Sequence, residues 1–193
     1  MRRALLTTLG GVFLAGSVAA ADLPEGDPAK GRKLAGQCRA CHGLDGYARI
    51  PIAPHIGGEP ASYLAGQLIA FREGTRNHEM MSVVARGLKD QQIADLAAWY
   101  ARHGATARLT ADPEMAPEAC VACHGADGIA LVEDAPNLAG ETNIYIDTQL
   151  KAFRSGKRVH EIMTEIALEM SDQDIRAAAD WYGDVKLEIE LKE

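Results

Sequence analysis

The sequence predicts an all-α fold of two tandem helical domains, and the prediction depends on an internal repeat and on the spacing of apolar residues. When the chain is shifted by 82 positions, its second half superposes on its first without a gap, from Cys38 on Cys120 to Tyr100 on Tyr182. An ungapped match of this length indicates a duplicated domain. Within each copy, apolar residues recur at the three- and four-residue intervals of a helix face. We therefore expect the same succession of helices twice.

Each copy contains one C-x-x-C-H pentapeptide, at residues 38–42 and 120–124, and together they use all four cysteines. Two thiols one helical turn apart can form thioethers with the vinyl groups of haem, and the adjacent imidazole can bind the iron. The sequence therefore predicts two covalently bound haem c groups, one in each domain. They would be attached through Cys38, Cys41, Cys120 and Cys123, with His42 and His124 as the proximal ligands.

The helices of the first copy can be placed from local signals. Asp27-Pro28 is typical of a helix start and predicts a helix from about Ala29 into the first motif. Residues 43–58 are rich in Gly and Pro and predict a loop. Leu64, Leu68 and Phe71 then share one face of a helix that ends at Gly74. Residues 75–88 are expected to form a second loop. A last helix should begin near Lys89, with an apolar face made by Ile93, Leu96, Ala97 and Tyr100.

The second copy departs from the first ahead of its haem motif. Pro117 falls inside the expected first helix, where proline removes a backbone donor and clashes with the preceding turn, so this helix should be short or broken. Ser171 and Asp174 have the spacing of a capping box at the start of the last helix. The sequence predicts no strand ahead of the C-terminal tail. Residues 184–193 alternate between polar and apolar, which leaves an added strand and a frayed end both open.

The N-terminus has the features of a secretory signal peptide over residues 1–21. Arg2 and Arg3 precede an apolar stretch over residues 4–18, and Ala19-Ala20-Ala21 provides small residues at the cleavage site. The apolar run is shorter than the roughly 20 residues of a membrane-spanning helix. The mature chain contains no other apolar stretch of that length, so we expect an exported, periplasmic protein without an integral membrane segment. Its predicted units are a first domain over residues 22–103, a linker over 104–111, and a second domain with a short tail over 112–193.

Charge is distributed unevenly between the two copies. Residues 22–107 carry 10 basic and 9 acidic side chains, whereas residues 108–193 carry 8 basic and 18 acidic, a net charge of −10. This balance argues against nucleic acid as a partner and favours docking of the acidic end on a basic surface of a redox protein. An acidic face that only maintains solubility is the alternative.

A haem for electron transfer needs a second axial ligand, and methionine sulfur is a suitable one. The mature chain offers Met80, Met81, Met115, Met163 and Met170. Only Met81 and Met163 superpose in the repeat, and both are expected in a polar loop instead of on an apolar helix face. We therefore predict Met81 and Met163 as the distal ligands. His78 and His160 also superpose, which keeps a bis-histidine site open.

Further residues are expected around the haems. The carbonyl groups of Pro54 and Pro136 are candidate acceptors for the free ring nitrogen of each proximal histidine. Haem propionates need hydrogen-bond donors, and the candidates are Arg72, Arg154, Tyr63 and Tyr145. A solvated helix end for the arginines and ordinary packing for the tyrosines are the alternatives. His55 and His103 have no repeat partner and are expected on the surface.

Zinc binding, a redox-active pair and structural disulfides are other possible uses of the cysteines, but each explains fewer features of the sequence than haem attachment does. A zinc site would require the two pairs to converge, although each belongs to its own repeat. A thioredoxin-like pair would need a preceding strand. Two disulfides in an exported protein are conceivable, but they give no reason for the repeated histidine and methionine.

With these motifs in place, residues 27–183 resemble the dihaem cytochrome c4 family, which consists of tandem class I cytochrome c domains. The resemblance implies two cytochrome c folds lying against each other, with haems that have histidine and methionine ligands. It assigns Cys38, Cys41, His42 and Met81 to one haem, and Cys120, Cys123, His124 and Met163 to the other. It also implies electron transfer in the periplasm, commonly towards a terminal oxidase.

We therefore expect a soluble periplasmic electron carrier and not an enzyme. The alternative is a cytochrome subunit of a dehydrogenase complex, as in flavocytochrome c sulfide dehydrogenase. A dihaem peroxidase would need a vacant sixth position on one iron, which a methionine at both repeat positions argues against. From charge alone, the second haem should have the lower potential, because negative surroundings favour ferric iron.

Overall fold

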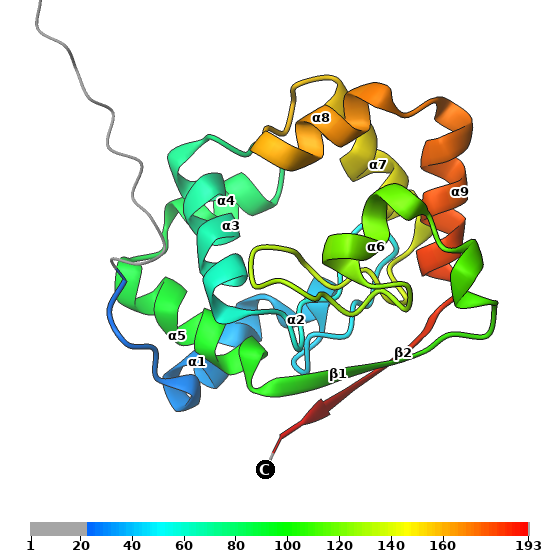
Figure 1. Cartoon of the computed structure of the whole chain (residues 1–193). Helices are drawn as coiled ribbons and strands as arrows, with labels where there is room; N and C mark the ends of the chain where they lie inside the picture. Colours follow the sequence, from blue (N-terminus) through cyan, green and yellow to red (C-terminus); the bar gives the residue numbers. More distant parts are fainter. Residues whose placement is uncertain (1–22, 193) are drawn as a thin grey trace, which may run out of the picture.

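The structure, a computed structural model, describes residues 23–192; the predicted signal peptide over residues 1–21 lies outside this range. The chain is mostly helical, which confirms the predicted fold class (Figure 1). The helices of the first half are α1 (Pro28–Leu34), η2 (Ala35–Gln37), α2 (Arg39–His42), α3 (Ala61–Glu73), α4 (Met81–Arg86) and α5 (Asp90–Ala101). The second half contains η3 (Pro113–Met115), α6 (Glu118–His124), α7 (Asn143–Arg154), α8 (Glu161–Glu169) and α9 (Asp172–Gly183). Two strands, β1 (His103–Arg108) and β2 (Lys186–Leu191), complete the fold.

Local signals explain where several helices begin and end. The Asp27 carboxylate accepts hydrogen bonds from the backbone N–H groups of Ala29 and Lys30, and Pro28 occupies the first turn of α1. Ser171 and Asp174 form the predicted capping box of α9, with each side chain bonded to the backbone of the other. Gly74 has a φ of 79°, which glycine adopts at little cost, and it ends α3. These interactions satisfy backbone groups that a helix terminus leaves unpaired.

Each half has its own apolar core. In the first half, Ile93 and Leu96 of α5 pack with Leu64 and Ile69 of α3 and with Ala35. In the second half, α7 and α9 provide the core, which consists of Ile146, Leu150, Ile175, Ala178, Ala179 and Tyr182. The second core contains fewer buried residues than the first.

The start of the second half confirms the prediction made from Pro117. This proline is the N-cap of α6, and the only helix ahead of it in the second half is the short η3. In the first half, α1 packs across α5 at the corresponding place. Where α1 would lie in the second half, a cavity of about 640 Å³ opens between α6, α8 and α9, with Cys120, Met170 and Trp181 in its lining.

The packing of α1 on α5 depends on Gly31, which gives a stability prediction. A Cβ atom at Gly31 would lie 1.9 Å from the carbonyl oxygen of Asp95, whereas one at Gly36 would have no atom within 4 Å. We expect Gly31→Ala to lower the free energy of unfolding by about 3 kcal/mol, because the two helices must separate. Gly36→Ala, the matched control, should change it by less than about 1 kcal/mol. Denaturant titration of both variants measures the difference, and equal stabilities would contradict the close packing.

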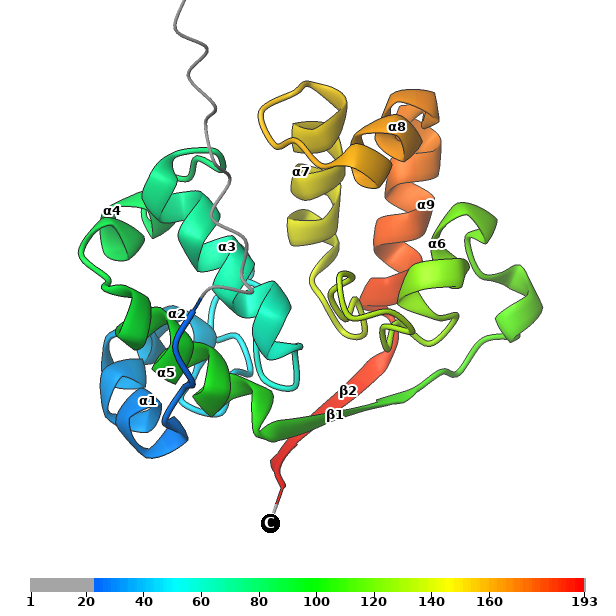
Figure 2. The same ribbon diagram turned by 60° about the vertical axis from the view of Figure 1, so that its left-hand side comes forward.

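The prediction that the chain has no convincing strand is wrong. Residues 103–108, which overlap the predicted linker, form β1 and pair antiparallel with β2 from the C-terminal tail, with Ala105 opposite Ile189 and Ala107 opposite Leu187. The ribbon of β1 and β2 passes beneath both halves (Figure 2). A Cβ atom at Gly57 would lie 2.7 Å from the Ile189 side chain, and one at Gly140 would lie 2.7 Å from that of Leu187. The tail therefore packs against the loops of both halves and is not a frayed end.

The segments expected as loops after α3 and α7 are in part helical. Met81 begins α4, and Met163 lies in the first turn of α8. These helices were missed because they are short and follow glycine- and charge-rich turns. None of the helices in residues 23–192 is long and apolar enough to cross a membrane.

Candidate haem sites

The two cysteine motifs lie on short helices that place both thiols one turn apart. Cys38 is the N-cap of α2, which contains Cys41, and α6 contains both Cys120 and Cys123. None of the four cysteines, all of which lie within residues 23–192, is paired in a disulfide. Burial raises the pKa of the Cys38 thiol, and it raises that of Cys120 to about 11. The first cysteine of each pair lies against the apolar core of its half, which is the cause of this rise.

The histidine of each motif is fixed by the loop that follows it. His42 Nδ1 lies 2.9 Å from the carbonyl oxygen of Pro54, and His124 Nδ1 lies 2.8 Å from that of Pro136. A carbonyl can only accept, so Nδ1 carries the proton and Nε2 presents a lone pair. Both rings are buried, and burial lowers the pKa of both imidazoles, so they remain neutral. This is the state that a proximal iron ligand requires.

The C-terminal helix of each half holds the residues just after the motif. Trp99 Nε1 donates to the carbonyl oxygen of Leu44 at 2.9 Å, and Trp181 Nε1 donates to that of Ala126 at 2.9 Å. The Tyr100 and Tyr182 hydroxyls donate to the carbonyl oxygens of Gly43 and Gly125. Both halves thus fix the end of their haem motif in the same way.

Met81 and Met163 lie at the starts of matching helices, and both are half-buried. Met163 packs against the second core, whereas Met80 is 62% exposed. The candidate rivals, His78 and His160, each accept a hydrogen bond at Nδ1 from the backbone N–H of the methionine three residues later, at 3.4 and 3.3 Å. His160 is the N-cap of α8, whereas His78 lies three residues ahead of α4, whose N-cap is Met80. Their Nε2 atoms are not used in these bonds; His160 Nε2 lies 3.5 Å from Asp134.

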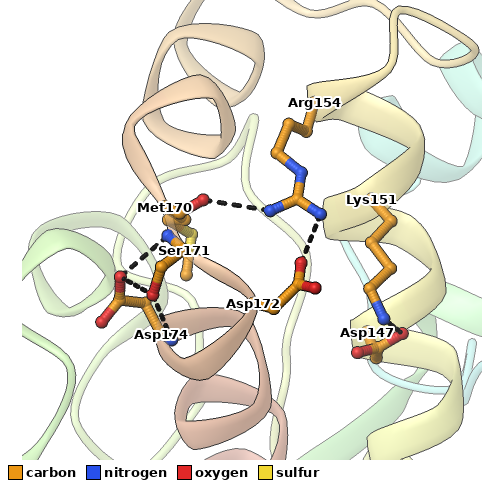
Figure 3. Close-up of polar contacts among 7 residues, drawn as sticks. All are labelled: Asp147, Lys151, Arg154, Met170, Ser171, Asp172 and Asp174. Carbon is orange, nitrogen blue, oxygen red and sulfur yellow. Dashed lines mark hydrogen bonds and ion pairs between the residues drawn. The ribbon is translucent and has the colours of Figure 1, made fainter.

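The structure gives Arg72 and Arg154 equivalent protein partners. Arg72 donates to the Leu88 carbonyl and to Asp90, and Arg154 donates to the Met170 carbonyl at 3.1 Å and to Asp172 at 2.6 Å (Figure 3). Both arginines connect the end of one helix with the start of the last helix in their half. Figure 3 also shows the capping box of Ser171 and Asp174 beside this contact.

The residues of both sites fit a covalent haem. Each offers two thiols one turn apart, a neutral imidazole with a free Nε2 and a methionine at the start of a nearby helix. A shared zinc site does not fit, since no three His, Cys, Asp or Glu side chains cluster as metal ligands within residues 23–192.

Comparison with known proteins agrees with this geometry. Residues 28–101 match the family model "Cytochrome c", and residues 114–181 match "Cytochrome C oxidase, cbb3-type, subunit III". Cytochrome c4 of Pseudomonas aeruginosa is 32% identical over 92% of this chain and 94% of its own length. The chain belongs to the dihaem cytochrome c4 family. It is therefore a c-type cytochrome for electron transfer, with covalently bound haem c.

Some proteins similar to this cytochrome have names that mention a dehydrogenase. A protein named "Thiosulfate dehydrogenase electron acceptor" from Thiomonas intermedia is 34% identical over 94% of this chain and 90% of its own length. Among solved structures, reduced cytochrome c4 from Pseudomonas stutzeri has a TM-score of 0.72 at 27% identity, covering 83% of this chain and all of that one. Thiosulfate dehydrogenase (TsdBA) from Marichromatium purpuratum has a TM-score of 0.71 at 30% identity, covering 82% of this chain and 40% of that one.

In this cytochrome, Tyr63 and Tyr145 lie where the two halves meet. Arg158 of the second half donates to the Tyr63 hydroxyl at 3.2 Å, and Arg76 of the first half lies 3.4 Å from the Tyr145 hydroxyl. Each arginine also donates to both Gln67 and Gln149. Figure 2 shows α3 and α7, which provide these tyrosines and glutamines, facing each other.

The expectation that His55 and His103 are surface residues is wrong. His103 is 3% exposed, and its ring stacks edge-on against Trp99. His55 is 8% exposed; its Nδ1 accepts from the Ala48 backbone N–H at 2.9 Å, and its Nε2 lies 3.0 Å from the Gly140 carbonyl oxygen. His55 therefore connects the two halves in its neutral form.

Sequence reasoning missed several residues between the halves. These are Gln67, Gln149, Arg76, Arg158, Glu59, Glu141, His55 and Asn137. All but the last two superpose as identical pairs in the 82-residue repeat, and this was the signal that could have found them. Identity at both repeat positions is expected when a duplicated domain packs against its own copy.

Proposed function

We propose that this chain carries single electrons between redox proteins of the periplasm through two haem c groups, one at each motif. When bound, the haems supply the one-electron chemistry of iron between its ferrous and ferric states. The observation that carries the proposal is the repeated set of two thiols, an Nδ1-anchored imidazole and a methionine. His42 and His124 would bind iron through Nε2, and Met81 and Met163 would occupy the opposite positions.

The protein contributes rigidity to this function. The Pro54 and Pro136 carbonyl groups fix the plane of each proximal imidazole, and the hydrogen bonds of Trp99 and Trp181 fix the backbone behind it. A site held in this way changes little between the two oxidation states, which favours fast electron exchange. Contacts with the haem propionates stay predictions for Arg72, Arg154, Tyr63 and Tyr145. Each of these side chains also has a protein partner, as described above.

The proposal includes the organisation and location of the mature protein. We place a first domain over residues 22–103 and a second over 112–193, with the first strand of the ribbon in the connection between them. The signal peptide proposed over residues 1–21 would export the chain and be removed. Haem would then be attached in the periplasm.

A dehydrogenase is the partner that the relatives favour. One similar protein is named as the electron acceptor of thiosulfate dehydrogenase, and the solved structure of such an enzyme is similar over 82% of this chain. We therefore propose an oxidising partner, such as a terminal oxidase, and a reducing partner of the dehydrogenase class. The net charge of −10 on residues 108–193 favours docking on a basic surface. Permanent association with such an enzyme as its cytochrome subunit is the second candidate.

A carrier and a dihaem enzyme differ in the sixth position of each iron. We expect the oxidised protein to accept two electrons per chain, and the reduced protein to show no spectral change with carbon monoxide, because the sixth position of each iron would be filled by a protein ligand. Stoichiometric binding of carbon monoxide to one haem would contradict the carrier proposal at that site. Size-exclusion chromatography of the protein from its native source separates the two candidates: a free carrier elutes alone, whereas a subunit elutes with a dehydrogenase.

A further inference from the structure

Two buried carboxyl groups lie at the contact between the halves, and neither is used in the haem sites as described. Glu59 is 4% exposed and Glu141 is 2% exposed, and they occupy the same position of the repeat. The Glu59 carboxyl accepts hydrogen bonds from the backbone N–H of Asn137 at 3.0 and 3.1 Å. The Glu141 Oε1 atom accepts from the backbone N–H of His55 at 2.8 Å, and its Oε2 atom is buried without a hydrogen-bond partner. Each carboxyl thus reaches into the opposite half.

The backbone groups that bind these carboxyls belong to the same peptide bonds that hold the proximal histidines. The carbonyl of the Pro54–His55 peptide lies 2.9 Å from His42 Nδ1, and its N–H donates to Glu141. In the second half, the carbonyl of the Pro136–Asn137 peptide accepts from His124, and its N–H donates to Glu59. One peptide group therefore connects each buried carboxyl with the proximal histidine of the opposite half.

Hydrogen bonds linked through one peptide group polarise each other. When Glu141 is ionised, it draws the N–H of His55 and increases the negative charge on the Pro54 carbonyl oxygen. That oxygen then accepts more strongly from His42, which becomes a better electron donor to iron. Ionisation of the carboxyl therefore favours ferric iron, and its protonation favours ferrous iron. The same argument joins Glu59 with His124.

The surroundings of Glu59 and Glu141 favour the protonated form of both carboxyl groups. Burial raises the pKa of Glu59 to about 8, and burial together with the charge of Glu59 raises the pKa of Glu141. The His55 ring is neutral and faces Ala48 and Gly140.

The other elements around the carboxyls offer them no counter-charge. On α3, Tyr63 lies near Glu59, and its hydroxyl accepts a hydrogen bond from Arg158 of the second half. The guanidinium of Arg158 is otherwise bonded to Gln67 and Gln149. From the ribbon, the residues against these loops are Ala105, Leu187 and Ile189, which are apolar.

We propose that Glu59 and Glu141 are redox-linked proton sites of this cytochrome, each acting on the haem of the opposite half through one peptide group. Each carboxyl would take one proton from solvent when the haem of the opposite half accepts an electron from the reducing partner. It would return that proton to solvent when the electron passes to the oxidising partner. The proposal rests on the proposed function, because it needs haem at both motifs. Glu59 and Glu141 act as positioning residues, since neither contacts the iron ligands.

The test is a potentiometric titration of the purified holoprotein at several pH values on both sides of about 8. We expect the potential of at least one haem to fall as the pH rises through this range, because the ionised carboxyl stabilises ferric iron. A tenfold difference in the acid dissociation constant between the two oxidation states corresponds to about 59 mV for one electron. Potentials that do not depend on pH in the wild-type protein would overturn the proposal.

Glutamine variants assign the effect to each carboxyl. Glu141→Gln should remove the pH dependence of the first haem, and Glu59→Gln should remove that of the second, because glutamine keeps the accepting oxygen but cannot ionise. Glu188→Gln on the exposed face of β2 is the matched control and should leave both potentials unchanged. Persistence of the wild-type pH dependence in both interface variants would also overturn the proposal.

A second measurement does not depend on the variants being stable. Infrared difference spectra between the reduced and oxidised wild-type protein should show a protonated carboxyl that appears on reduction near pH 8. Absence of this band would contradict proton uptake by Glu59 or Glu141. Haem content and iron–methionine absorption are measured on the same samples, so that a missing haem or ligand, which would contradict the proposed function, is distinguished from a failure of the proton linkage.

Discussion

Replacing Cys120 and Cys123 with alanine should leave a protein that carries one haem instead of two. Each motif lies on its own helix and in its own half, and the first cysteine of each motif packs against the core of that half. Loss of one pair should therefore not prevent attachment at the other. We expect the haem absorbance per chain to fall by half and the intact mass to fall by one haem.

Loss of its haem should lower the stability of the second half more than loss of the other haem lowers that of the first half. Its core is the smaller of the two, and a cavity of about 640 Å³ lies where α1 packs in the first half. A covalent cofactor stabilises a small domain by adding apolar surface to its core. The reciprocal variant, with Cys38 and Cys41 replaced by alanine, is the control and should also keep one haem. Retention of two haems in either variant, or loss of both, would contradict independent attachment.

Met81→Ala should remove the distal ligand of the first iron, whereas Met80→Ala should not. The two residues are adjacent, but Met80 is 62% exposed and has isoleucine at its repeat position, while Met81 is half-buried and superposes on Met163. Loss of a sulfur ligand should lower the potential of that haem and open its sixth position. We expect Met81→Ala to bind carbon monoxide at one haem per chain when reduced, and Met80→Ala to behave like the wild-type protein.

Other results for the two variants would assign the distal ligand of the first iron to a different residue. If Met80→Ala lost the ligand and Met81→Ala kept it, the repeat would be misleading at this position. If neither variant changed, His78 would become the candidate, since its Nε2 atom takes no part in the hydrogen bond from the Met81 backbone. Met163→Ala repeats the test in the second half, where the residue before it is Ile162.

The sequence predicted the helices that depend on local signals and missed contacts between distant segments. Pro117 acts on its own turn, so its effect on the start of α6 could be foreseen, as could the capping box at Ser171. The pairing of β1 with β2 joins segments about 80 residues apart. In residues 103–108 the alternating apolar side chains are only the small ones of Ala105 and Ala107, and alanine is a weak strand signal. Only the folded chain brings these two segments together.

The contact between the halves was missed for a different reason. Charged residues such as Glu59 and Glu141 are almost always exposed, so burial is a poor expectation from sequence alone. His55 was placed on the surface because it has no identical repeat partner, yet Asn137 takes the equivalent place and makes equivalent hydrogen bonds. A side chain in a duplicated domain can keep its role while its chemical type changes.

The central claim is that both irons have histidine and methionine ligands, and the near-infrared absorption of the oxidised protein tests it most directly. Iron bound by methionine sulfur gives a weak band in this region, which can be quantified per haem. We predict two equivalents of this band per chain, one from Met81 and one from Met163. One equivalent or none would contradict the account at the corresponding haem and leave a histidine ligand or an open catalytic position in its place.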